Sequence, residues 1–403
     1  MKALIIFFLV LFISVSSCRA DKNDMIMHNA QYEVDIDILK KEYNVPVSSY
    51  FKSVKPIFLE TKENCLLQSI GGIQVTDDYI FILDKKYKRL YCFSKEGKFV
   101  RRIGNLGSGP GEFSNISDFT IDSNGTIYTV DPYGNKIHSY TLSGKHISSF
   151  QLKKIEGYLG HIQVVGDFLY LDFEAEKKTS KADIPLLLKV DKNSGEIVNK
   201  YLSVYKHNLG FPFITGKDGS FFYSKNSNKP CYAPIYSSII FSLDNGVEPY
   251  FRINSKRLLQ KKDLEKLDFS HSQVKMKIDE IHKIKSIKNF IEVENYIFCQ
   301  YFDDSSSGSD ILLYNKKSGE ASLYDAFVDD YFYKTTDRAL MPHFGCSDKK
   351  GIYAFTHVQE MPIFIESYKS GDIKFELDKE QHNQINKFLE EMNPPLFYYE
   401  LKE

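Results

Sequence analysis

The sequence predicts an all-β fold assembled from a repeated unit, and three observations support this prediction. The 403-residue chain contains 27 Tyr and 31 Phe but no Trp, and these two aromatic side chains favour half-buried, pleated strands. Short alternating apolar segments are joined by polar turns that contain a glycine. These turns recur at nearly constant spacing, which is typical of a repeat architecture and is not expected of a single β-sandwich.

The clearest repeat lies in the first half of the chain. Residues 90–103 (LYCFSKEGKFVRRI) align without a gap on residues 137–150 (IHSYTLSGKHISSF) at an offset of 47 residues, and the strands that precede them follow the same offset. The alignment places Gly97 on Gly144. Because glycine supplies the positive φ that a tight turn requires, each copy is interpreted as a two-stranded hairpin.

Four weaker copies continue the pattern, and a further strand precedes most of them. The steps between the six turn glycines are 47, 51, 51, 73 and 52 residues, and the glycines are Gly97, Gly144, Gly195, Gly246, Gly319 and Gly371. A unit of about 45–50 residues with roughly four strands is typical of a propeller blade. The sequence therefore predicts a six-bladed β-propeller.

Two segments depart from the strand pattern. Lys256–Ile281 is highly charged and has a helical periodicity, so we expect a helical insertion between blades 4 and 5 that explains the long step. Asp378–Met392 predicts a short C-terminal helix before a final strand, Leu396–Leu401. An isolated early strand, Val54–Glu60, is expected to join the C-terminal strands in one blade, because ring closure removes exposed strand edges.

The N-terminal segment predicts export and a lipid anchor. Residues 1–17 combine a basic start with an apolar run that is short for a membrane span, and small residues precede Cys18. We expect a signal peptide, with an uncleaved anchor helix as the alternative. The Val-Ser-Ser-Cys step resembles a bacterial lipobox, which implies that Cys18 is diacylated and stably anchored as the mature N-terminus. Residues 18–31 are then the tether, and residues 32–403 the propeller.

The composition indicates which kinds of partner and which cellular location to expect. The net charge is −1 and the basic residues are dispersed, so a nucleic-acid partner is not expected. We expect a monomeric lipoprotein of the outer membrane that faces either the periplasm or the cell surface. Five further cysteines are widely spaced and lie mostly in apolar strands, so buried thiols are expected in place of disulfides. They are Cys65, Cys92, Cys231, Cys299 and Cys346.

The chain resembles the six-bladed β-propeller lipoproteins of Bacteroidetes, which are related to NHL-repeat propellers. The segments that carry the resemblance are 57–67 (IFLETKENCLL), 79–84 (YIFILD), 96–113 (EGKFVRRIGNLGSGPGEF), 116–122 (ISDFTID) and 393–403 (NPPLFYYELKE). The GxGPGEF part is the most specific, and the similarity covers nearly all of the mature chain. The resemblance implies the architecture and an envelope location, and it supplies no catalytic residue or ligand.

Two aromatic and polar segments are candidate binding sites, because tyrosine and aspartate bind glycans or peptides by stacking and hydrogen bonding. They are residues 325–338 (DAFVDDYFYKTTDR) and 223–236 (YSKNSNKPCYAPIY). The candidate ligand-binding residues are Asp325, Asp329, Asp330, Tyr331, Tyr333, Tyr223, Tyr232 and Tyr236. Ordinary connections between the blades of a tyrosine-rich protein are the alternative interpretation.

Other motifs favour structural roles. The glycine-rich segment 104–111 is not followed by the helix that a phosphate loop needs, so it is interpreted as a loop between blades. Asp84 and Asp131 end equivalent strands and could contribute to a calcium site. Turn capping is the expected role of both, because Phe173 or Lys225 occupies the corresponding place in later blades.

The motifs of common catalytic sites are missing from the sequence, including GxSxG and metal-ligand spacings of histidine. We therefore expect a non-catalytic, lipid-anchored module that binds a protein or a glycan of the envelope through loops on a rigid framework. The alternative is a calcium-assisted hydrolase or lyase that acts on a sugar derivative through channel-facing Asp, Glu or His residues. Apart from calcium in that alternative, no metal or cofactor is expected.

Overall fold

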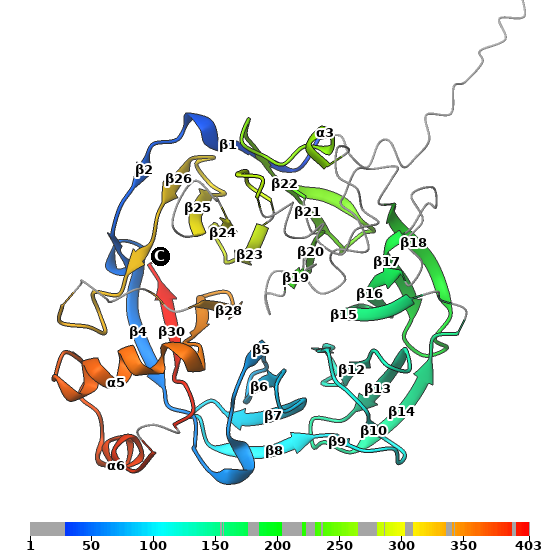
Figure 1. Ribbon diagram of the computed structural model, residues 1–403, viewed down its shortest axis with the longest axis horizontal. Coiled ribbons are helices and arrows are strands. Elements are labelled where there is room, and N and C mark those ends of the chain that lie inside the picture. The colour runs from blue at the N-terminus through cyan, green and yellow to red at the C-terminus, as the bar shows by residue number, and fades with distance from the viewer. Residues whose placement is uncertain are drawn as a thin grey trace, which may run out of the picture.

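The computed structural model is a ring of six β-sheets around a central axis (Figure 1). It describes residues 29–153, 155, 157–175, 185–203, 220–222, 230–234, 237–264, 280–285, 287–302, 309–335, 341, 343–388 and 392–402. The predicted signal peptide, Cys18 and most of the tether lie outside the described residues. The prediction of a six-bladed β-propeller is confirmed.

The first three blades are meanders of four antiparallel strands. Blade 1 contains β5 (Ile70–Val75), β6 (Tyr79–Asp84), β7 (Arg89–Ser94) and β8 (Phe99–Ile103). Blade 2 contains β11 (Asp118–Ile121), β12 (Ile127–Asp131), β13 (Lys136–Tyr140) and β14 (His146–Gln151). Blade 3 contains β15 (Gly157–Val165), β16 (Phe168–Ala175), β17 (Pro185–Asp191) and β18 (Ile197–Ser203).

Blades 4 and 5 each gain a fifth strand from the N-terminal segment, which runs along the outside of the ring (Figure 1). Blade 4 contains β19 (Ser220–Phe222), β20 (Cys231–Ala233), β21 (Ile239–Ser242) and β22 (Glu248–Asn254), with β1 (Tyr32–Asp35) parallel to β22. Blade 5 contains β23 (Ile287–Glu292), β24 (Tyr296–Phe302), β25 (Ser309–Asn315) and β26 (Ala321–Tyr324), with β2 (Lys41–Glu42) parallel to β26. We refer to residues 32–49 as the N-terminal strap.

Blade 6 joins the two ends of the chain. Its strands are β28 (His343–Ser347), β29 (Gly351–Phe355), β30 (Leu396–Leu401) and β4 (Phe51–Ile57). β30 and β4 are antiparallel, with Leu396 opposite Ile57. The predicted final strand and the predicted closure by an early strand are both confirmed, although that strand begins and ends three residues earlier than expected.

Short elements complete the described chain. Two-stranded pairs are formed by β9 (Asn105–Leu106) with β10 (Glu112–Phe113), and by β3 (Val45–Pro46) with β27 (Phe327–Val328). The 3-10 helices are η1 (Ile36–Ile38), η2 (Val47–Ser49), η3 (Glu63–Cys65) and η5 (Val358–Glu360). The predicted C-terminal helix is present as α6 (Lys379–Phe388). Among the described residues, no helix is both long enough and apolar enough to cross a membrane.

One turn glycine was assigned to the wrong structure. Gly371 follows a helix, α5 (Met361–Lys369), so the sixth copy of the repeat is not a hairpin. Met361 and Phe364, three residues apart, are both buried, which is the spacing of a helix that packs one face on a core. The blade count is still six, because β29 and β30 supply the hairpin strands and enclose α5 and α6 between them.

The predicted insertion between blades 4 and 5 is described only in part. One helical turn, α3 (Lys261–Leu264), lies within it, and residues 265–279 lie outside the described residues. The helical insertion over 256–281 therefore stays a prediction.

The hydrophobic core includes clusters that lie between neighbouring blades. The turn at Gly97 shows how closely blade 1 also approaches the segment that follows β4. Gly97 has φ +85°, and a Cβ at this position would lie 2.2 Å from the carbonyl oxygen of Phe58. Glycine is therefore required both by the turn and by the close approach of the neighbouring segment.

The five cysteines at positions 65 to 346 are buried free thiols, as predicted.

The strands alternate in direction, so the connections alternate between two faces of the ring. The upper face, as we define it, is the one at which the innermost strand of each blade begins. It carries longer connections, such as 104–117 and 325–335, and the segment that contains α5 and α6. The lower face carries short hairpin turns, such as 76–78, 122–126 and 166–167. The upper face therefore carries longer loops that are available for recognition.

Candidate functional site

A cavity of about 270 Å³ occupies the centre of the ring, at the upper part of the channel. Its lining includes residues from the innermost strand of every blade, namely β5, β11, β15, β19, β23 and β28. The polar side chains most relevant to binding are those of Lys85, Asp118, His161, Lys288 and Asn289. We refer to this cavity and its lining as the channel site.

Irregularities in the innermost strands shape the channel site. Shifts of register occur between Ile70 and Gly72, Leu159 and Ile162, Ile287 and Asn289, and Phe344 and Cys346. A β-bulge redirects side chains that the regular pleat would place elsewhere. His161 and Lys288 lie at two of these bulges, and glycines, Gly71 and Gly345, lie at the other two. Two bulges thus supply a basic side chain, and the glycines at the other two allow neighbouring atoms to approach closely.

The space at Gly71 is used by Lys85. A Cβ on residue 71 would lie 2.3–2.6 Å from the Cγ, Cδ and Cε atoms of Lys85, so the aliphatic part of the lysine passes directly over the bulge. The backbone N–H of Lys85 donates to the carbonyl of Ser69 at 2.9 Å, which fixes the start of the side chain next to β5. The lysine therefore reaches the channel from the second strand of its blade.

His161 is held by a carboxylate from the neighbouring strand. Its Nδ1 lies 2.7 Å from Oδ2 of Asp172, and its backbone N–H donates to Oδ1 of Asp172 at 2.5 Å. Because a carboxylate only accepts, Nδ1 carries the proton. Burial lowers the pKa of His161, but the carboxylates of Asp172 and Asp118 outweigh it, and the pKa lies above its ordinary value. The fold thus favours an imidazolium at this place.

Asp118 faces His161 from blade 2. Its Oδ2 accepts the backbone N–H of Ile162 at 3.0 Å. Burial raises the pKa of Asp118, and the positive charges of His161 and Lys85 oppose that rise only in part. On the other side of the ring, Asn289 donates its side-chain amide to the carbonyl of Phe344 at 3.1 Å. Among the described residues, these contacts leave the amines of Lys85 and Lys288 and the Nε2 atom of His161 to meet a ligand.

Asp172 stands where Asp84 and Asp131 stand in blades 1 and 2. Asp84 accepts the backbone N–H groups of residues 68, 69, 86 and 87, and Asp131 accepts those of residues 114 and 133. The predicted capping role of Asp84 and Asp131 is confirmed. The sequence pattern placed Phe173 at this position of blade 3, which is one residue too late. The turn before β16 consists of Gly166 and Asp167 alone and is one residue shorter than the corresponding turn of blade 1.

The predicted binding segment after Tyr324 packs against the N-terminal strap. Asp325 accepts the backbone N–H of Asn44 at 3.0 Å, and Asp330 accepts that of Ser48 at 3.0 Å. The hydroxyl of Tyr331 donates to the carbonyl of Phe51 at 3.1 Å. These polar side chains therefore bind a segment of their own chain.

The other predicted site residues are buried or lie outside the described residues. Asp329 is fully buried and accepts the hydroxyl of Tyr399 at 2.5 Å, and Tyr333 and Tyr232 are 9% and 2% exposed. Tyr223 and Tyr236 lie outside the described residues. None of the described candidates lines the channel site. Ligand binding by these eight residues stays a prediction.

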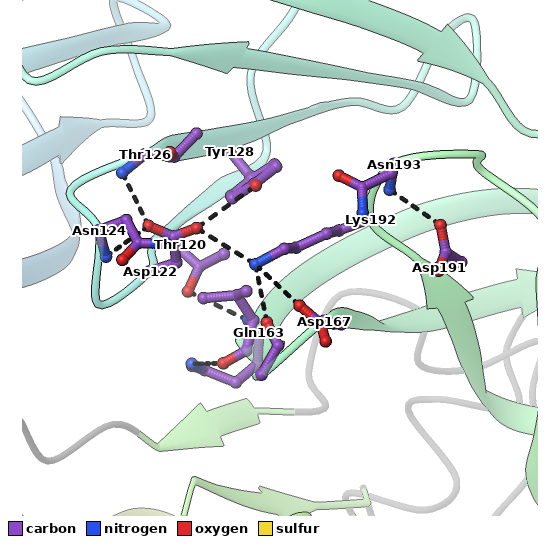
Figure 2. Close-up of polar contacts among 12 residues, drawn as sticks. Thr120, Asp122, Asn124, Thr126, Tyr128, Gln163, Asp167, Asp191, Lys192 and Asn193 are labelled. Atoms are coloured by element: carbon purple, nitrogen blue, oxygen red, sulfur yellow. Dashed lines mark hydrogen bonds and ion pairs between the residues drawn. The ribbon is translucent and has the colours of Figure 1, made fainter.

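The lower face has a second cavity, of about 550 Å³, which is lined by hairpin turns of blades 1 to 3 and by Asp244. Next to it, Lys192 connects blades 2 and 3 (Figure 2). Its Nζ lies 3.5 Å from Oδ2 of Asp122 and 3.6 Å from Oδ1 of Asp167, and it donates to the carbonyl of Gly166. The ammonium group of Lys192 is therefore paired within the fold, whereas Lys85 and Lys288 of the channel site form no ion pair among the described residues.

The described residues contain no group of three or more His, Cys, Asp or Glu side chains arranged to hold a metal ion. The channel site was not found from the sequence, because its members come from all six blades. The signal that was available is the glycine inside the strand patterns at positions 71, 72, 160 and 345, since glycine within a strand often marks a bulge.

A comparison with curated proteins gave no match. Among solved structures, a Bacteroides fragilis protein described as exported is 17% identical, with 92% of this chain and 99% of that chain covered and a TM-score of 0.69. A Bacteroides vulgatus protein of the DUF4221 family is 11% identical, with 87% and 97% covered and a TM-score of 0.48. The first likeness shows the fold alone.

A family described as a domain of unknown function, DUF4934, matches residues 32–400. This range covers the propeller from the N-terminal strap to the last strand. Together with the fold shared with the Bacteroides fragilis protein, the match confirms the resemblance to Bacteroidetes propellers. The chain belongs to the DUF4934 family.

Proposed function

We propose that this chain is a non-catalytic binding module of the cell envelope, anchored by a lipid on Cys18, that recognises a protein or a glycan with the upper face of its propeller. The channel site carries the proposal. Lys85 is placed by its path over Gly71, and His161 is oriented by Asp172. Groups that are fixed before a ligand arrives lose little conformational entropy on binding, which favours recognition.

The tether that the sequence predicts is short. Cys18 precedes Asn29, the first described residue, by 11 positions, so even a fully extended tether spans at most about 40 Å. The lipid would therefore hold the propeller close to the membrane. The fold shared with an exported Bacteroides fragilis protein supports an envelope location, and we place the chain in the outer membrane.

Metabolic labelling with an alkyne fatty acid in a Bacteroides host tests the anchor. The full chain should incorporate the label and sediment with membranes, Cys18→Ala should lose both properties, and Lys22→Ala should keep both. Label on the Cys18→Ala variant, or none on the unchanged chain, would show that the anchor has been assigned wrongly.

Site-directed blocking of each face tests the recognition surface. The native thiols of the described chain are buried, so a new exposed cysteine should be the site that reacts with a bulky maleimide. Tyr133→Cys places the label on the upper face, where Tyr133 is 69% exposed, and Lys349→Cys places it on the lower face. Binding to a panel of envelope glycans and peptides should be lost only with the upper label. Loss with the lower label alone, or turnover of a sugar derivative in calcium, would contradict the proposal.

A further inference from the structure

The channel site contains two lysines that the fold does not neutralise. Two partly buried lysines elsewhere are paired, Lys41 with Asp310 at 2.7 Å and Lys316 with Glu292 at 2.6 Å, whereas Lys85 and Lys288 are exposed. In the described part of the chain, Lys85 and Lys288 form no ion pair, although both line the cavity. A cation that faces a cavity without a counter-ion is a natural partner for an anionic ligand.

The charges of the site define the charge of that ligand. With His161 protonated and Asp118 and Asp172 ionised, the three positive charges of Lys85, Lys288 and His161 exceed the two negative charges by one. A monoanion would neutralise the site. A doubly charged phosphate would leave an excess of negative charge in a confined space, which is unfavourable. A metal cation would meet the two lysines and be repelled.

Part of the remaining lining is apolar and lies beside the polar side chains of Gln74, Gln163 and Asn289. Partly exposed rings of Phe221 and Phe222 in blade 4 and of Phe355 in blade 6 line the cavity. The blade 6 wall lies between the blades that carry Lys85 and Lys288. The site therefore offers an apolar surface next to two amines. A volume of 270 Å³ corresponds to roughly nine waters, or a ligand of about ten non-hydrogen atoms.

From these observations we infer that the channel site binds the carboxylate of a small monocarboxylic acid with an apolar body, held by Lys85, Lys288 and His161. The inference rests on the proposed function, because it names what the upper face recognises. The same chemistry is offered by a free organic acid and by the C-terminal carboxylate of a peptide that ends in an apolar residue, and the experiment below separates these two sources.

Binding should depend on pH through His161. The carboxylates of Asp172 and Asp118 and the amine of Lys85 are the charged groups that act on its ring. Because its pKa lies above the ordinary value, the imidazolium and the affinity for an anion are present at low pH and decline as the pH rises through that pKa. His161→Gln should bind more weakly at pH 6 and should show little change in affinity between pH 6 and pH 9.

Calorimetric titration of the purified propeller with phenylacetate and with its neutral isostere phenylacetamide tests the inference. Phenylacetate should bind at least tenfold more tightly. Lys85→Met and Lys288→Met should each weaken its binding tenfold or more, Lys288→Arg should restore most of it, and Lys349→Met on the lower face should leave it unchanged. Thermal unfolding of each variant separates loss of binding from loss of the fold.

A peptide ending in Phe and its C-terminal amide form the second arm. Binding of the peptide acid alone assigns the site to chain ends, and binding of phenylacetate alone assigns it to free acids. Equal binding of acid and amide in both arms, or no binding by any acid, overturns the inference. The maleimide label on Tyr133→Cys separates this failure from failure of the proposed function. If that label still blocks binding to the envelope panel while no carboxylate binds, the proposed function stands and only the carboxylate assignment fails.

Discussion

Asn393 connects the last segment of the chain to the segment that leads into blade 1, and its replacement by alanine should destabilise the closed ring. The side chain is 1% exposed and makes three hydrogen bonds. Oδ1 accepts the backbone N–H of Leu67 at 2.8 Å, and Nδ2 donates to the carbonyls of Glu60 and Cys65 at 2.9 Å each. All three partners belong to the segment that leads from β4 into blade 1.

The cost of Asn393→Ala follows from these contacts. Three net hydrogen bonds at about 1 kcal/mol each are lost, and one buried N–H and two carbonyls are left without this partner. We expect the free energy of unfolding to fall by about 3–5 kcal/mol, because leaving buried groups unpaired adds to the loss of the bonds themselves.

Urea unfolding followed by circular dichroism measures this change. Asn245→Ala, at an exposed turn of blade 4, is the matched control and should change the free energy of unfolding by less than about 0.5 kcal/mol. A loss below about 1 kcal/mol for Asn393→Ala would refute the reasoning that this amide holds the ring closed.

Three further changes test other parts of the structure by the same unfolding assay. Gly97→Ala should destabilise the protein by more than about 3 kcal/mol, because the new Cβ would lie 2.2 Å from a backbone carbonyl oxygen. Gly166→Ala, which has open space around it, should cost about 1 kcal/mol. Equal losses for the two variants would contradict the argument. Lys192→Met should cost about 1–2 kcal/mol by leaving the nearly buried Asp122 without its cation, and an unchanged urea midpoint would show that the pair contributes nothing. His161 has a raised pKa in the folded chain, so its contribution to stability is complete below about pH 6.5 and is lost as the pH rises through the folded pKa. His161→Gln should therefore reduce the difference in the free energy of unfolding between pH 6 and pH 9. An unaltered difference would show that His161 is not its source.

The regular part of the fold could be predicted because it is encoded locally. A hairpin needs alternating residues and a glycine with positive φ, and both are visible at Gly97 and Gly144. The helix before Gly371 was missed because its apolar residues also suit a strand over such a short length. Ring closure could be expected on general grounds, but the register of β30 on β4 depends on contacts across the whole chain.

The channel site could not be predicted, because bulges and not motifs create it. A bulge changes which side of a strand a residue faces, and the sequence shows only that His161 follows a glycine. Lys85 reaches the channel because Gly71 on the adjacent strand has no side chain, which is a relation between two strands. The tyrosines and aspartates near residue 330 drew attention by composition, yet the contacts described for them lie within the chain.

Ring closure also has a consequence for biosynthesis. β4 pairs with a strand that begins 339 residues later, so at about 5–20 residues per second a ribosome needs roughly 17–70 s to supply the partner. During this interval β4 is an unsatisfied edge that could template aggregation. Its sequence, FKSVKPI, contains Lys52, Lys55 and Pro56, which are residues that disfavour premature pairing with another chain. The nascent strand thus carries its own protection until translation ends.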